Sequence, residues 1–346
     1  MKKPFSRICF LALLTLLCLV MLASVSVGSA ELSMWDGLRI LLHKIPFFGE
    51  AWEISDIGDV YETIIWEVRM PRVLLSALTG GALAIVGAAY QGIFLNSLAD
   101  PHILGVSSGA ALGATIAMLT GASVRFLGLG TVGIFAFGGA MVTVILVCAV
   151  ANTGSGMSAM HMLLTGTAVS TMLSAAISLL MTFHHDQIAK VYLWTMGSFS
   201  AASWEKAGFL SVFVLIGAAV FVAGAGKLNL MLLGVEEAKC LGVDTLRLQR
   251  IFILASSVLV AAAVSVSGII GFVGLIVPHC VRILCGPDNR KVMPYGLLSG
   301  AIFLVICDTA ARTIAAPTEI PVGVITSLFG APYFIALLLK KRRRQR

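Results

Sequence analysis

Ten long apolar segments dominate this sequence and restrict what it can fold into. They lie at approximately residues 8–28, 70–91, 103–121, 127–150, 161–183, 207–226, 250–267, 269–286, 293–311 and 321–339. A helix needs about 20 apolar residues to cross the hydrocarbon core of a bilayer. The segments lack the alternation of apolar and polar residues that is typical of membrane β-barrel strands. Because the chain is also 58% hydrophobic and only 12% charged, we predict an all-α integral membrane protein with about ten transmembrane helices. These form a single domain over residues 1–346.

The first segment has a second interpretation, because it also resembles a secretory signal peptide. Lys2 and Lys3 precede the apolar run, and small residues follow it at positions 27–30. The run is about 20 residues long, whereas the apolar region of a signal peptide has about 7–15 residues. We therefore predict that residues 8–28 are retained as the first span, with cleavage as the alternative.

Two features of the span pattern concern the arrangement of the helices. Only Ser267 and Gly268 separate the seventh segment from the eighth, so these segments are either two spans or a broken, re-entrant pair. Spans 2–5 and 7–10 each follow a longer polar stretch, and their offset of five spans gives the two sets opposite directions. An inverted repeat, which is common in transporters, is our hypothesis for the two sets.

Positive charges predict the direction of the spans. Ten spans put both termini on one side, and placing that side in the cytoplasm puts 16 of the 24 Lys and Arg residues inside. Six of them form a basic tail at residues 340–346. Cytoplasmic connections carry such an excess of Lys and Arg. We therefore expect a multi-pass protein of the cell membrane with both termini in the cytoplasm. The net charge of +7 then needs no nucleic-acid partner.

The longest connection, residues 29–69, is an external loop in this orientation. It holds eight acidic residues, which contribute little to orientation. We interpret this loop as a solvated external cap.

The sequence has no pattern typical of an enzyme or of a resident cofactor. Residues 221–228 lack the first glycine and the final hydroxyl of a phosphate-binding loop. The seven cysteines include no CxxC pair, so we expect neither a disulfide framework nor a zinc site. His184-His185-Asp186 is interpreted as a solvated helix end rather than a metal site. We predict that the chain has no catalytic residue and binds no cofactor or metal ion.

Charged residues are rare inside the predicted spans. A charge at the bilayer centre costs at least about 2.5–3.5 kcal/mol, yet ion-driven transporters usually keep several acids there. Asp308 lies four residues before Arg312, where the two can pair on one helix face. His279 and Arg282 lie toward the inner end of span 8. Because these residues form no obvious proton relay, any transport energy is expected to come from elsewhere.

Three polar clusters remain at the span ends. Arg69, Arg72 and Arg312 lie on the outer side. Residues 96–101 form a tight inner turn, because Pro, Asp and Asn favour turns. The mixed-charge run at residues 234–244 lies inside and suits a short helix on the membrane face. Taken singly, each cluster is also explained as a snorkelling anchor or a plain turn.

A series of sequence blocks gives these clusters a common interpretation. The blocks are Arg69-Met70-Pro71-Arg72-Val73-Leu74, Gln91-Gly92-Ile93-Phe94, Asn96-Ser97-Leu98-Ala99-Asp100-Pro101, Leu104-Gly105-Val106-Ser107-Ser108-Gly109-Ala110, Glu237-Ala238, Leu241-Gly242-Val243, Gly271-Phe272-Val273-Gly274-Leu275-Ile276-Val277-Pro278-His279, Asp308, Arg312, Glu319-Ile320-Pro321-Val322-Gly323 and Gly330-Ala331-Pro332. In this order, from about residue 69 to 340, they resemble the FecCD-type permease subunits of ATP-binding-cassette (ABC) importers. Such importers carry ferric siderophores, haem and cobalamin. The family usually has Pro after the Asn of the inner turn, where this chain has Ser97, which predicts a looser turn.

The resemblance implies partners and roles for the polar clusters. It implies a permease homodimer, or a dimer with a paralogous permease, with the pathway between the protomers. Two cytoplasmic ATPase subunits that bind ATP-Mg and an external substrate-binding protein complete the assembly. By motif position, the binding protein docks on Arg69, Arg72 and Arg312, and the cytoplasmic gate contains Asn96 and Leu98. The cytoplasmic loop at residues 227–249 couples to the ATPase through Gly234, Glu236, Glu237, Ala238, Leu241 and Gly242.

The function implied by the resemblance is import of a metal chelate by alternating access, with no bond change catalysed by this chain. A ferric siderophore is the expected cargo, and haem, cobalamin and oxyanions are alternatives. An ion-gradient-driven secondary transporter is a rival interpretation, against which the lack of midplane acids counts. A membrane-embedded enzyme is another, but the sequence presents no catalytic constellation.

Overall fold

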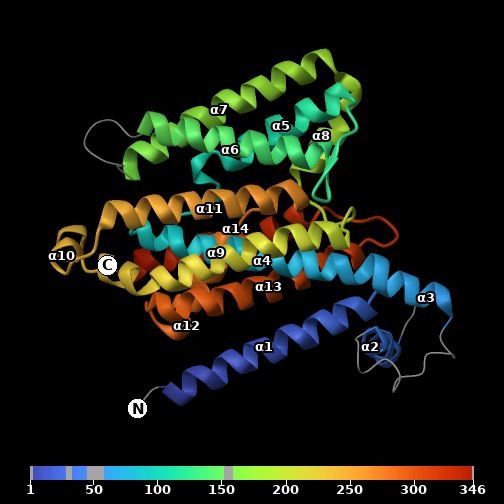
Figure 1. The fold of residues 1–346 in the computed structure, drawn as a ribbon, viewed down its shortest axis with the longest axis horizontal. Coiled ribbons are helices and arrows are strands. Elements are labelled where there is room, and N and C mark those ends of the chain that lie inside the picture. Colours follow the sequence, from blue (N-terminus) through green and yellow to red (C-terminus); the bar gives the residue numbers. More distant parts are fainter. Residues whose placement is uncertain (1–2, 29–32, 45–57, 152–158, 345–346) are drawn as a thin grey trace.

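Figure 1 shows the computed structural model, which describes residues 3–28, 33–44, 58–151 and 159–344. The described part is almost entirely helical. Its one hairpin pairs β1 (Arg125–Phe126) with the antiparallel strand β2 (Leu129–Gly130).

Ten apolar helices correspond one by one to the ten predicted segments. They are α1 (Lys3–Ser26), α4 (Met70–Ile93), α5 (Val106–Thr120), α6 (Thr131–Ala151), α7 (Ala159–Phe183), α9 (Trp204–Met231), α11 (Thr245–Ser267), α12 (Val273–Cys285), α13 (Asn289–Thr313) and α14 (Val322–Arg344). Seven of the described helices are long and apolar enough to cross a membrane, whereas α5, α12 and the apolar part of α14 are shorter. The prediction of an all-α, multi-pass membrane protein is confirmed.

Short elements lie at the two ends of the helix bundle. Figure 1 shows α10 (Val235–Cys240) at the same end as the start of α1 and the end of α14. At the opposite end lie α2 (Met34–His43) and α3 (Asp59–Thr63), both within the loop predicted to be external. The remaining short elements are η2 (Ile64–Arg69), η3 (Pro101–Leu104), η4 (His185–Gln187) and α8 (Ile188–Thr195). We call the end with α10 the inner end and the other the outer end.

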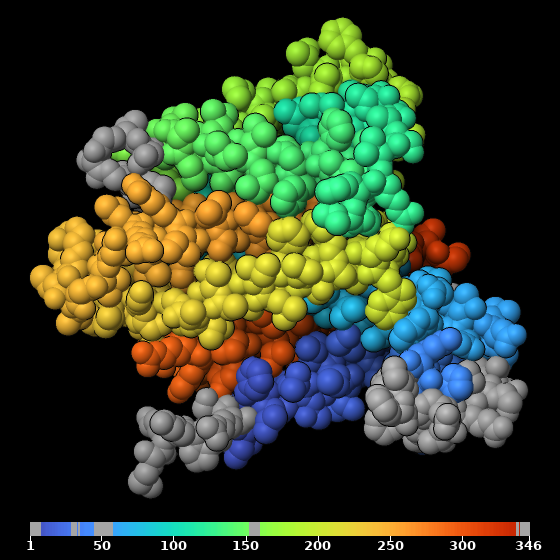
Figure 2. All heavy atoms as spheres, viewed as in Figure 1, coloured from blue at the N-terminus to red at the C-terminus, as the bar shows by residue number. Residues whose placement is uncertain are grey.

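The central helix is α4, and glycines let its backbone touch those of its neighbours. Gly80 contacts the backbone of Gly300 on α13, and Gly87 contacts the backbone of Gly274 on α12. Small residues permit this close approach between helices in lipid, where packing rather than the hydrophobic effect drives association. Figures 1 and 2 show α5, α6 and α7 as a layer along one edge of this core.

The first helix is packed as part of the bundle. It lies along α13, and the hydroxyls of Ser24 and Thr309 are 2.7 Å apart. Val25 is fully buried, together with Ile40 of α2 and Ile65 of η2. The first segment therefore forms a helix that packs in the bundle, and its retention as a span stays a prediction.

The seventh and eighth spans are separated by a buried break. Residues 268–272 leave the helical conformation, with positive φ angles of 71° at Gly268 and 69° at Phe272. The 13 residues of α12 give a helix only about 20 Å long. Its first turn lies within the protein, because Gly274 packs against Pro101 as well as α4. Non-helical backbone at membrane depth is tolerated where protein buries it.

The two short helices α5 and α12 occupy corresponding places in the predicted repeat. Each is the second helix of its set, and each follows a residue with positive φ, Gly105 or Phe272. Short or interrupted helices at matching positions are typical of inverted repeats and point to the transport pathway. The hypothesis of a repeat is therefore supported.

We predict that Gly87→Ala destabilises the protein. The added methyl group would overlap the carbonyl of Gly274, with backbone on both sides of the contact. Overpacking of a filled interior costs typically about 1–3 kcal/mol, so the purified variant should unfold at a lower temperature in detergent. Gly138→Ala on the exposed face of α6 is the control, because its methyl group would meet nothing within 4 Å. An equal decrease in unfolding temperature in both variants would contradict the role of Gly87 in helix packing.

Candidate functional site

At the outer end, Arg72 joins three parts of the chain. Its Nη2 lies 2.9 Å from Oδ1 of Asp308, its Nε lies 3.0 Å from Oδ2, and its Nη1 lies 2.8 Å from Oε1 of Glu319. The Arg72 side chain is 11% exposed and that of Asp308 only 1%. A two-pronged guanidinium–carboxylate pair is both strong and geometrically specific. It connects α4 to α13 and to the segment before α14.

The pairing of Asp308 with Arg312 predicted from their spacing is present, but it is the longer contact. Arg312 Nε lies 3.9 Å from Asp308 Oδ2. The closer partner, Arg72, is 236 residues away in the chain, a separation at which no local spacing rule applies. Asp308 thus serves two arginines and is held mainly by Arg72.

Arg69 and Arg312 bind the carbonyl groups at the end of α1. Arg69 Nη1 donates to the carbonyl oxygens of Val25 and Ser26 at 2.9 and 3.0 Å. Arg312 Nη1 donates to the carbonyl oxygen of Val27 at 2.9 Å, and its Nη2 contacts the carbonyl of Ser24. The last carbonyls of a helix have no intrahelical partner and carry its negative dipole end, which favours cations.

The three predicted docking arginines are therefore brought together, but their guanidinium groups bind within the chain. Arg69 is 6% exposed and the Arg312 side chain 8% exposed. A carboxylate arriving from outside would have to replace contacts that these side chains already make. Their docking role stays a prediction.

The inner turn is shaped by side chains that bond to its own backbone. Asn96 Oδ1 accepts a hydrogen bond from the Leu98 N–H at 3.0 Å, and Asp100 Oδ1 accepts one from the His102 N–H at 2.8 Å. Asn96 and Ser97 are exposed, and Leu98 is half-buried. The turn therefore closes with serine at position 97, where the resemblance predicted a looser turn.

His102 connects this turn to the break before α12, a role that the sequence analysis missed. Its Nε2 lies 3.0 Å from the carbonyl oxygen of Ile270, and its Nδ1 contacts the Ser107 hydroxyl. Because a carbonyl only accepts, Nε2 carries the proton and the Ser107 hydroxyl donates to Nδ1. His102 and Ile270 are 168 residues apart in the sequence, so no short sequence motif could predict their contact.

The predicted coupling segment forms α10, held between two glycines of unusual conformation. Gly234 has φ +134° and Gly242 has φ +81°, values that L side chains rarely adopt. Ala238 is fully buried, whereas Glu236 and Lys239 form an exposed ion pair at 2.8 Å.

Four leucines around α10 are exposed. Of these, only Leu241 was among the residues predicted from the sequence to couple to the ATPase. The four leucines are Leu232 at 40%, Leu233 at 65%, Leu241 at 58% and Leu246 at 43% exposure. We call these residues the leucine patch. Leu232 and Leu233 follow α9 and Leu241 follows α10, so these three lie outside the spanning helices, whereas Leu246 lies in the first turn of α11. Exposed apolar side chains that lie close to charged residues in the chain are a candidate protein-interaction surface.

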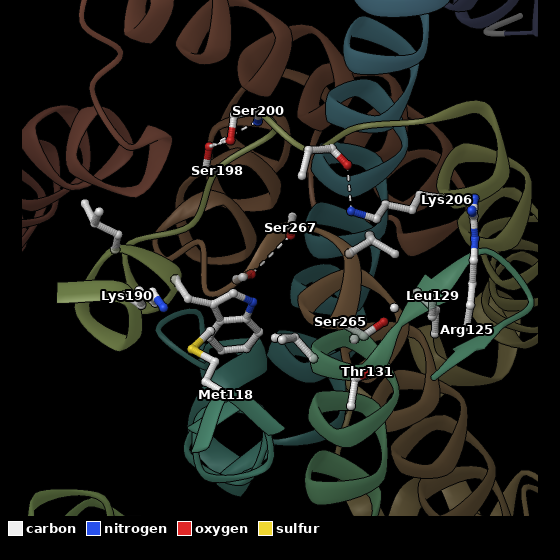
Figure 3. A pocket seen from close by; sticks show the side chains of 18 of the residues that line it. Met118, Arg125, Leu129, Thr131, Lys190, Ser198, Ser200, Lys206, Ser265 and Ser267 are labelled. Atoms are coloured by element: carbon white, nitrogen blue, oxygen red, sulfur yellow. Dashed lines mark hydrogen bonds between the residues drawn. The ribbon is translucent and has the colours of Figure 1, made fainter. Parts of the chain in front are cut away.

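A cavity of about 840 Å³ opens at the outer end (Figure 3). Its walls come from the β1–β2 hairpin, α8, the end of α11 and the segment before α14. Arg125, Lys190 and Lys206 supply positive charge, and Trp194 and several serine hydroxyls complete the lining. None of these residues was predicted from the sequence to belong to a site.

Metal-binding groups do not gather in the part of the chain that the structure describes. No cluster of three or more His, Cys, Asp or Glu side chains there could hold a metal ion. His184, His185 and Asp186 lie exposed around η4.

Comparisons with known proteins agree on one family. The sequence model of the FecCD transport family matches residues 16–340. The cobalamin import system permease protein BtuC of Halobacterium salinarum is 41% identical over 310 residues, covering 90% of this chain and 80% of that protein. The hemin transport system permease protein HmuU of Yersinia pestis is 38% identical and covers 96% of both chains.

A solved structure has the same fold along nearly the whole chain. It is a metal-chelate type ABC transporter in an inward-facing conformation, with 32% sequence identity and a TM-score of 0.82. The match covers 96% of this chain and 99% of the other.

We predict that Arg72→Ala strongly destabilises the protein, because it leaves the buried Asp308 without its main partner. Removing one member of a buried ion pair costs about 3–5 kcal/mol. Size-exclusion chromatography in detergent should show a large loss of monodisperse protein. The double variant Arg72→Met, Asp308→Leu removes both charges and should recover most of that loss. If Arg72→Ala were as stable as the parent, the stability of the protein would not depend on the pair of Arg72 with Asp308.

A second prediction concerns His102. His102→Phe keeps a ring but loses the N–H that binds Ile270, so the inner turn should become more accessible. His102→Gln retains a donor and should behave like the parent. The measurement is the labelling rate of a cysteine placed at position 98, where the parent side chain is half-buried. The label is a membrane-impermeant maleimide, applied to inverted vesicles that contain the protein without its seven native cysteines. Equal labelling rates in the parent, His102→Phe and His102→Gln would show that the bond to Ile270 does not hold the inner turn in place.

Proposed function

The chain belongs to the FecCD transport family, the permease subunits of ABC importers for metal-chelate type substrates, and from this premise we propose its cargo, partners and mechanism. The proposed cargo is a ferric siderophore, which an external binding protein delivers and which leaves into the cytoplasm. Relatives named for cobalamin and hemin support a metal chelate in general, so haem and cobalamin, together with oxyanions, are the alternatives.

The leucine patch around α10 is the observation that carries the proposal. A permease that uses ATP needs a surface where movements of the ATPase reach the membrane helices, and ATP is available only in the cytoplasm. Exposed leucines lie close in the chain to Glu236, Glu237 and Lys239, so this end of the protein offers both apolar and charged side chains to a partner. We assign this surface to a separate cytoplasmic ATPase subunit that binds ATP-Mg, so that a permease dimer binds two such subunits. The inner end, with both termini, then faces the cytoplasm.

A second surface supports a permease dimer. Only 6% of the apolar stretch of α7 is buried, and its exposed face carries hydroxyl groups at helical spacing. These belong to Thr167, Thr171, Ser174, Ser178 and Thr182. Four of them donate to carbonyl oxygens of their own helix, so these four hydroxyl groups are satisfied within α7. We assign this face to a pathway between two copies of the chain, or between this chain and a paralogous permease.

Alternating access is the proposed mechanism. Movement of α10 after ATP binding would reach the gate at Asn96 and Leu98, and His102 links that turn to the break at residues 268–272. The Ser198 N–H donates to the carbonyl of Ser267 at 2.8 Å, and the Gly323 N–H donates to that of Met196 at 3.0 Å. These bonds continue the connection to the outer ends of α11 and α14.

The rival mechanism, coupling to an ion gradient, needs a titratable group near the midplane. Beyond the first turns of the described spanning helices, Asp308 is the one carboxylate, and Arg72 already neutralises it. This arrangement supports an ATP-driven importer over a secondary transporter.

The experiment that tests the function is gentle purification of the tagged chain from its native membranes, followed by mass spectrometry. A stoichiometric ATPase subunit is the expected companion. A chain that comes alone even after cross-linking would reject the ATP-driven importer.

We predict that Leu241→Asp weakens association with the ATPase about tenfold or more. Burying a leucine side chain contributes about 1.5–3 kcal/mol, and an aspartate in its place adds a desolvation cost. Association is measured by pull-down of the co-purified ATPase at graded concentrations. Leu127→Asp, a 66% exposed leucine in the outer hairpin, is the control and should leave association unchanged. Comparable weakening by both substitutions would contradict the role of the patch.

A further inference from the structure

The outer cavity contains two lysines whose charges the described residues leave without an acidic partner. Lys190 on α8 makes no hydrogen bond or ion pair with any residue that the structure describes. Lys206 at the start of α9 donates from Nζ to the carbonyl oxygen of Ala201 at 2.6 Å. No carboxylate in the described chain lies within ion-pair distance of either ammonium group.

The other charged groups of the cavity are paired in part. Arg125 forms an ion pair with Glu205 on α9. Glu319, the one carboxylate among the described lining residues, lies 2.8 Å from Arg72, which also binds Asp308. Lys190 and Lys206 together outweigh the single negative charge of Glu319, so the cavity is net positive.

The position of Lys206 is electrostatically unfavourable by itself. It lies in the first turn of α9, where Ser203 caps the helix and the dipole favours anions over cations. It is also half-buried, which weakens the hydration of its charge. One carbonyl oxygen uses one of its three N–H donors, so an anion in the cavity would satisfy the others.

Hydroxyl groups extend the polar wall around these cations. Ser198 and Ser200 lie together on the segment after α8, with their hydroxyl oxygens 3.1 Å apart, and Ser123 also lines the cavity. Figure 3 shows Lys190 and Lys206 on separate sides of the space, with Ser265 and Ser267 between them. Ammonium groups and hydroxyls at several points suit a ligand with more than one carboxylate.

We propose that this cavity is an entry site that binds the carboxylate groups of an anionic chelate before it reaches the pathway. The inference rests on the proposed function, because it assigns the cargo a carboxylate-rich chemistry. The volume, about 840 Å³, lies in the range of small-molecule sites and exceeds what a single acidic side chain of a docking protein would fill. The cations lie within the walls of a hollow, which also favours a small ligand over a protein surface.

Citrate is the probe for this site, and Trp194 in the cavity wall is the reporter. The purified permease with its co-purified ATPase is titrated with citrate, and tryptophan fluorescence is followed. Subtracting the response of Trp194→Phe isolates the signal of this residue among the five tryptophans. We expect a saturable response that weakens with ionic strength, because charge attraction is screened by salt. The uncharged ester triethyl citrate should give none.

Substitutions connect the response to the two lysines. The double variant Lys190→Gln, Lys206→Gln should weaken citrate binding by about tenfold or more, because each substitution removes a charge-assisted hydrogen bond. Lys206→Arg keeps the charge and should retain binding. Lys291→Gln, which changes a half-buried lysine in the first turn of α13 at the inner end, is the matched control and should bind citrate like the parent.

Two outcomes would overturn the site. One is the absence of a saturable Trp194 response at millimolar citrate, and the other is unchanged binding after both lysines become glutamine. The proposed function is tested separately, by co-purification of the ATPase subunit. If every variant retains its ATPase but citrate binding fails as described, the entry site is rejected and the proposed function is not.

Discussion

Backbone groups that leave a helix inside a bilayer find no water, and this constraint organises the whole molecule. The break at residues 268–272 exists only because other helices enclose it. The enclosure depends on α4, whose glycines let the backbones of α12 and α13 come into direct contact. A bulkier α4 would hold its neighbours away and expose the break to lipid. The broken segment, the inner turn that it touches and the short helix that follows it all depend on this close packing.

The hydrophobic pattern was sufficient to predict ten spans, because the thickness of the bilayer fixes their length. It also indicated a break near Gly268, since two apolar segments met there without a polar connection. Helix ends were predicted less accurately. The helix α9 begins and ends several residues outside the predicted segment, because Lys206 lies in its first turn and Lys227 lies four residues before its end. Long side chains can reach the interface from such positions.

The candidate site was predictable only where its signals are local. The glycines that bound α10 and the Asn and Pro of the inner turn were evident from the sequence, since each constrains its own backbone. The main partner of Asp308 was not, and neither was the partner of His102, because folding alone brings those residues together. The exposed leucines around α10 were missed because leucine is common throughout a membrane protein. Docking, gating and coupling roles remain predictions from the family resemblance.

The capping of α1 by two arginines has a consequence for how the protein is assembled. Arg69 follows the end of α1 closely in the chain, but Arg312 lies 285 residues beyond the carbonyl of Val27 that it binds. Synthesis proceeds from the N-terminus, so the first helix enters the bilayer long before its second clamp exists. Until α13 has been inserted, α1 is held by Arg69 and its own apolar length. The contacts of Arg312 with the end of α1 therefore form only after α13 has been inserted, so the final position of the first helix depends on the insertion of a late one.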